Sequence, residues 1–111
     1  MNGELERFIE ACIAKGNAEE SCDFNFAKDK GCYRIISSVY RSLKESNQLD
    51  KLLVLLDHEN PYVRMWAATY TLQLPSSKAV DVLEVISTST GTLGFIAETT
   101  LLEWRKGSLK L

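Results

Sequence analysis

Apolar residues recur in the first half of the chain at the spacing of helices that bury one face. From Leu5 onward they follow i, i+3, i+4, i+7, i+8, which predicts a helix over residues 4–15. A cation followed by a glycine, Lys15-Gly16, predicts its end. A longer helix is predicted over residues 26–44, where Gly31 marks a kink or a close packing approach. Its apolar side carries Phe26, Cys32, Tyr33, Ile36, Val39, Tyr40 and Leu43.

The second half of the chain predicts four shorter helices. Residues 50–57 are apolar nearly all round, which is typical of a helix between two layers. Asn60-Pro61 then combines an N-cap with a proline at the first helical position and predicts a helix over residues 61–74. The last two helices are predicted over residues 77–87, with Val85 on the apolar side, and over residues 92–105. No stretch alternates with period two, so the predicted fold class is all-α.

The second half also repeats itself at an offset of thirty residues. Leu52-Leu53 falls on Val82-Leu83, and Trp66 falls on Ile96. Repeats of this length indicate stacked helix pairs, and the first two helices read as a diverged first pair. The chain is therefore predicted to be one domain over residues 1–111, with pairs at 1–47, 48–75 and 76–107.

Two stretches resemble known families. Leu-Leu-x-Leu-Leu-x-x-x-x-Asn-Pro-x-Val-Arg-x-x-Ala-Ala, from Leu52 to Ala68, resembles the short class of HEAT-like repeats. Ala97-Glu98, Leu101 and Trp104-Arg105-Lys106-Gly107, together with the chain length, resemble a small bacterial family of single-domain proteins, domain of unknown function 2019. The HEAT-like resemblance implies a right-handed helical-hairpin solenoid of about three helix pairs.

The same resemblance gives Arg64 a structural role. In HEAT-like repeats the arginine of the Val-Arg pair commonly bonds an acidic or carbonyl partner that joins neighbouring repeats, and Asp57 is the candidate partner here. Gly94 stands where that arginine would recur, so the last pair is expected to lack the contact.

Charge and composition narrow the class of protein. A formal net charge of −2 disfavours a general nucleic-acid or anionic-membrane surface. No apolar run reaches the roughly 20 residues that span a bilayer. The N-terminus is acidic and lacks the features of a secretory signal, so a cytoplasmic protein is expected. Acidic residues form two clusters near the N-terminus, Glu4, Glu6, Glu10 and Glu19, Glu20, Asp23. They are expected to be solvated helix faces, or alternatively a docking surface for a basic partner.

The cysteines and the single histidine predict no catalytic or metal site. Cys12, Cys22 and Cys32 lack the paired spacing of zinc ligands and are expected to be small buried hydrophobes. A Cys22–Cys32 disulfide is the alternative, unusual in a reducing compartment. His58 stands in an acidic turn with no nucleophile beside it, so no catalytic residue, metal or cofactor is predicted.

The aromatic residues of the repeats are expected to be mostly core. They are Tyr62, Trp66, Tyr70, Phe95 and Trp104. Tyr62 beside the turn, with Tyr33 and Tyr40, is the better candidate for a partly exposed anchor in an interface.

The expected function is protein binding without catalysis, for example as an immunity-type or regulatory partner of another protein. The candidate binding residues lie at the turn and on the following helix: His58, Glu59, Tyr62 and Arg64. The partner is expected to be another protein, and the sequence also allows a homo-oligomer. The HEAT-like resemblance leaves two alternatives, a protein related to bilin lyases and a nucleic-acid-backbone-binding protein.

Overall fold

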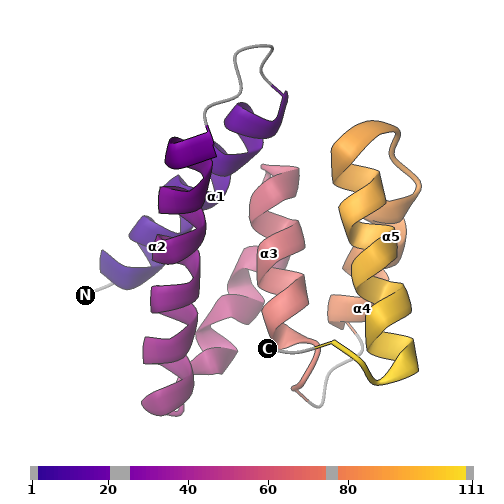
Figure 1. The fold of residues 1–111 in the computed structure, drawn as a ribbon. Helices are drawn as coiled ribbons and strands as arrows, with labels where there is room; N and C mark the ends of the chain where they lie inside the picture. Colours follow the sequence, from indigo (N-terminus) through magenta and orange to yellow (C-terminus); the bar gives the residue numbers. More distant parts are fainter. Residues whose placement is uncertain (1–2, 21–25, 75–77, 110–111) are drawn as a thin grey trace. The chain divides into compact units, whose positions relative to one another are not determined.

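The computed structural model describes residues 3–20, 26–74 and 78–109, without the side chains of 18–20 and 26–30. All regular secondary structure in the described part is helical, with no strand, which confirms the all-α prediction (Figure 1). The elements are α1 (Gly3–Glu20), α2 (Phe26–Glu45), the 3₁₀ helix η1 (Leu49–Asp57), α3 (Pro61–Thr71), α4 (Lys78–Ser87) and α5 (Gly91–Lys106).

The chain divides into two compact units, Met1–Lys51 and Leu52–Leu111. In the first unit α1 and α2 pack against each other. In the second unit α4 packs against both α3 and α5. The 3₁₀ helix η1 starts in the first unit and ends in the second.

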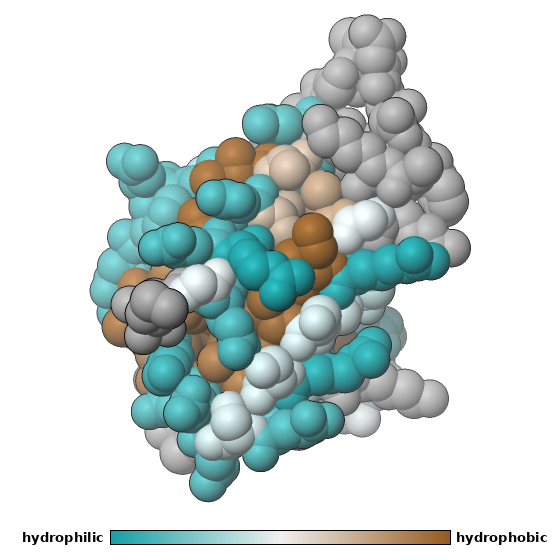
Figure 2. All heavy atoms as spheres, turned by 90° about the vertical axis from the view of Figure 1, so that its left-hand side faces the viewer, coloured by the Kyte–Doolittle hydropathy of each residue, from teal (hydrophilic) through white to brown (hydrophobic). Residues whose placement is uncertain are grey.

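The first unit is a helical hairpin with a small apolar core. Phe8 and Cys12 of α1 and Ile36 of α2 are fully buried. The side of the molecule formed by α1 and α2 is mainly hydrophilic, with apolar residues in the middle of that face (Figure 2).

Two glycine predictions for the first unit are wrong. The helix predicted to end at Lys15-Gly16 continues to Glu20, and Lys15 and Gly16 are themselves buried within it. Gly31 lies inside an unbroken α2, and a Cβ atom built there would meet nothing within 4 Å. It therefore marks neither a close approach nor a break.

The segment predicted as an all-round buried α-helix is a 3₁₀ helix with one exposed side. A 3₁₀ helix has three residues per turn, so Leu49, Leu52 and Leu55 fall on one side, and all three are buried. Val54 lies on the other side and is 68% exposed. The sandwiched arrangement expected for residues 50–57 is thus wrong.

The most deeply buried helix of the second unit is α3. Val63, Met65 and Ala67 have no exposed surface, and α4 contributes Ala79 and Leu83 to the same core. The helix ends at Thr71, three residues before the predicted end. The expected stop at Pro75-Ser76-Ser77 lies outside the described residues.

Candidate functional site

The turn between η1 and α3 is built from side chains that cap its backbone. Asn60 has extended backbone angles, and its Oδ1 accepts hydrogen bonds from the backbone N–H groups of Tyr62 at 2.9 Å and Val63 at 3.3 Å. Pro61 follows at the first helical position. The predicted N-cap is therefore confirmed, and α3 starts where the sequence indicated.

The side chains of His58 and Arg64 form hydrogen bonds with backbone groups of the same turn. The backbone N–H of Asn60 donates to His58 Nδ1 at 3.0 Å. Arg64 Nη1 donates to the backbone carbonyls of His58 at 2.7 Å and Glu59 at 3.0 Å. One guanidinium thus satisfies two turn carbonyls, and charged donors make the stronger hydrogen bonds of proteins.

The expected pairing of Arg64 with Asp57 is wrong. Asp57 Oδ2 instead pairs with Lys78 Nζ at 2.8 Å, and this ion pair joins the end of η1 to the start of α4. Arg64 finds its partners in the carbonyls of its own turn. The partners of Arg64 are therefore backbone carbonyls within one turn, and not an acidic side chain.

Beside this turn lies an apolar groove between α3 and α4. Its volume is about 350 Å³, and its lining residues are Arg64, Lys78, Asp81, Val82, Val85 and Ile86. Val85 is 71% exposed at its edge, although the sequence placed it on the apolar side of its helix. Lys78 and Asp81 provide the charged rim, so the groove has the make-up of a site for an apolar side chain.

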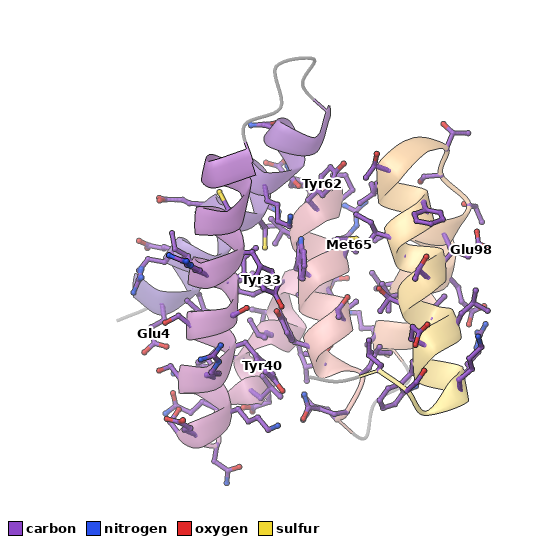
Figure 3. The ribbon with its side chains drawn as sticks, viewed as in Figure 1. Glu4, Tyr33, Tyr40, Tyr62, Met65 and Glu98 are labelled. Carbon is purple, nitrogen blue, oxygen red and sulfur yellow. The ribbon has the colours of Figure 1, made fainter. Side chains whose placement is uncertain are left out.

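The four predicted binding residues do not share one surface. His58 and Arg64 are half-buried and Glu59 is exposed, and the turn brings these three together. Tyr62 is only 4% exposed and lies at the start of α3 (Figure 3), so the prediction of a partly exposed anchor there is wrong. Its position directly after the cap directs it inward with the buried face of α3.

The other aromatic residues divide between core and surface. Tyr40 is 5% exposed, against prediction, whereas Tyr33, two turns earlier on α2, is 48% exposed as predicted (Figure 3). Tyr70 is buried and stacks on half-buried Trp66, with ring centroids 6.0 Å apart. Phe95 was expected in the core but is 69% exposed.

Phe95 lines a second apolar depression, which lies along α5. Its volume is about 210 Å³, and it is lined by Phe95, Ile96, Thr99, Thr100, Glu103 and Leu109. Leu102, further along α5, is 48% exposed. Helical periodicity placed Phe95 on an apolar face but gave no sign that this face lacks a covering element.

The cysteines behave as buried hydrophobes. Cys12 and Cys32 are both buried free thiols, which confirms the prediction of small buried hydrophobes for these two. Burial raises the pKa of the Cys12 thiol far above its ordinary value, and the neighbouring Cys32 adds to the rise. Cys12 is therefore a protonated, unreactive thiol. Cys22 lies outside the described residues.

Among the described residues no group of three or more His, Cys, Asp or Glu side chains could hold a metal ion. The same residues include no helix that is both long and apolar enough to cross a membrane. What the turn region does offer is an apolar groove with a charged rim, next to a rigid, hydrogen-bonded turn.

The fold and this surface define a small all-α protein with an apolar groove in its second unit. The family model of domain of unknown function DUF2019 matches residues 5–101, so the chain belongs to that family. Comparisons with curated proteins and with solved structures gave no match.

Proposed function

We propose that this protein is a small protein-binding domain of the HEAT-like repeat type, without catalysis, acting in the cytoplasm. The observation that carries the proposal is the groove between α3 and α4, where Val85 is 71% exposed beside Arg64 and Lys78. Large exposed apolar residues with a polar rim are typical of protein interaction sites. The partner would place an apolar side chain in the groove and polar groups on Lys78 and Asp81.

Arg64 beside the groove is ordered by hydrogen bonds, which supports this use. Its guanidinium bonds two backbone carbonyls, whereas Lys78 forms only an exposed ion pair with Asp57. Side chains that are already ordered lose little entropy on binding. This arrangement fits a role of the protein as a regulatory or immunity-type binder, which must bind its target tightly through a small surface.

The thirty-residue repeat supports a HEAT-like arrangement of the second unit, with η1 and α3 as one helix pair and α4 and α5 as the next. The ion pair between Asp57 and Lys78 then links consecutive pairs. With α1 and α2 as a diverged first pair, the whole chain would form the right-handed solenoid that the sequence pattern indicates.

Two exposed valines give a matched test. Val85 at the groove is 71% exposed and Val54 on η1, which does not line the groove, is 68% exposed. Affinity capture from a lysate of the source organism would use wild type, Val85→Asp and Val54→Asp. We expect a stoichiometric partner that Val85→Asp loses and Val54→Asp retains.

Two outcomes would count against the proposal. Equal capture by both variants would move the binding site away from the groove. Recovery of a chromophore or of nucleic acid in place of a protein would favour the alternatives related to bilin lyases or to backbone binding.

A further inference from the structure

The exposed side of α2 carries a basic and hydroxyl-rich surface that the groove in the second unit does not include. It is a shallow depression of about 490 Å³. We call it the α2 strip; its lining residues are Tyr33, Arg34, Ser37, Ser38, Arg41, Ser42 and Glu45. All of them except half-buried Ser37 are exposed.

Two arginines of this strip are unpaired in the described part of the chain. Within the described ranges, Arg34 and Arg41 make neither an ion pair nor a hydrogen bond through their side chains. Other arginines of the chain do have partners. Arg64 bonds two carbonyls, and Arg105 Nη2 pairs with Glu84 Oε1 at 3.4 Å. The guanidinium groups of the strip are therefore available to an external anion.

The spacing of these arginines matches a second helix. Arg34 and Arg41 are two helical turns apart, so their Cα atoms are separated by about 10 Å along the axis of α2. Carboxylates seven residues apart on a partner helix have the same separation. Ser37 and Ser38 lie between the arginines and can donate to the same carboxylates.

Tyr33 adds an apolar contact at one end of the strip. It is 48% exposed, and tyrosine and arginine are the residues that most often dominate binding energy at protein interfaces. Glu45, at the other end, would face a basic residue of the partner. This mixed end fits a protein helix better than a uniformly negative backbone.

We infer that the α2 strip docks an acidic amphipathic helix of a partner protein, with carboxylates seven residues apart on Arg34 and Arg41. The strip lies in the first unit and the apolar groove in the second. The inference therefore goes beyond the proposed function, and each can fail without the other. Arginine is well suited to binding a carboxylate, because its planar guanidinium group can donate two parallel hydrogen bonds to the two oxygens.

The test is a titration of the ¹⁵N-labelled full chain, followed by NMR. The probe is an alanine-based helical peptide with two glutamates seven residues apart and leucines between them; its control has glutamines in place of the glutamates. We expect shifts in the backbone amides of α2 around Arg34 and Arg41. The glutamine peptide should bind about tenfold more weakly, since it lacks charged acceptors.

A matched pair of variants separates local recognition from net charge. Arg34→Gln with Arg41→Gln should weaken binding of the glutamate peptide about tenfold. Arg7→Gln with Lys106→Gln removes the same charge from exposed positions on α1 and α5 and should leave binding unchanged. Circular dichroism of both double variants checks that the helices are retained.

Three results would overturn the inference. The first is an absence of shifts in α2 with the glutamate peptide. The second is wild-type affinity in the Arg34/Arg41 variant, and the third is an equal loss of affinity in the Arg7/Lys106 control variant.

A further titration replaces the peptide with a short DNA duplex. Tighter binding of the duplex to the same amides would assign the strip to nucleic-acid phosphates instead.

Discussion

The turns at residues 57–61 and 87–91 stand thirty positions apart and hold equivalent helix starts by different chemistry. The first uses side chains, with Asn60 capping α3 and Arg64 bonding two carbonyls. In the second, Thr90 makes no side-chain cap bond, and Gly91 adopts a φ of 83°, in the left-handed region. The two helices therefore start at equivalent positions of the sequence, but the backbone enters them differently, through Pro61 in the first turn and through a left-handed glycine in the second.

Gly94 explains why the arginine does not recur. It is buried, and a Cβ atom built on it would overlap the carbonyl oxygen of Ser89. Ser89 occupies the repeat position of Glu59, whose carbonyl Arg64 binds. In the first turn an arginine side chain reaches that carbonyl, whereas in the second the helix backbone itself lies against it and leaves no room for a side chain.

The largest effect is expected for Gly94→Ala. Glycine-to-alanine changes inside helices usually stabilise by about 1 kcal/mol, but here the added methyl group must push the Ser89 backbone away. We expect a loss of about 3 kcal/mol in the free energy of unfolding, measured by urea denaturation. Gly31→Ala, where nothing lies within 4 Å, is the control and should stabilise the protein. Equal effects of the two changes would show that the close approach at Gly94 is absent.

Arg64→Met is expected to have the next largest effect. It keeps much of the apolar stem but leaves the carbonyls of His58 and Glu59 without the guanidinium, at a cost of about 2 kcal/mol in unfolding free energy. Arg105→Met removes only an exposed ion pair with Glu84, so it should cost well under about 1 kcal/mol. Urea denaturation measures both variants. Equal free energies of unfolding would show that the carbonyl bonds do not stabilise the first turn.

The two N-cap positions give a third, smaller contrast. Asn60→Ala should cost about 1 kcal/mol, because the amides of Tyr62 and Val63 lose their acceptor. Thr90→Ala should change the unfolding free energy by only a few tenths, since Thr90 provides no cap bond. A thermal denaturation series of the two variants measures the difference, and a larger loss for Thr90→Ala would reverse the assignment.

The sequence could predict the helix start in the first turn because the capping contacts are local. His58, Asn60 and Arg64 lie within one short segment, and the cap and proline signals are read from adjacent residues. The same holds for the end of α5, where Gly107 has a φ of 76° and donates to Glu103 and Trp104 as the Lys106-Gly107 signal indicated.

The exposed surfaces depend on packing and could not be read in this way. Periodicity identifies the apolar side of a helix but not whether another helix covers it, so Val85 and Phe95 were assigned to the interior and are exposed. The sequence does not indicate Lys78 as the partner of Asp57, because the two residues come together only when α4 packs on α3. The groove arises from the same packing.

The smallest effect separates this long-range contact from the local ones. Asp57→Asn removes the ion pair with Lys78, whose side chains are 73% and 50% exposed, so the loss should stay below about 1 kcal/mol. Because salt screens exposed charges, the difference from wild type should disappear at about 1 M salt, whereas the loss in Asn60→Ala should persist. Urea denaturation at low and high salt distinguishes the two. A salt-independent loss in Asp57→Asn would mean that Asp57 acts through the structure of η1 and not through its charge.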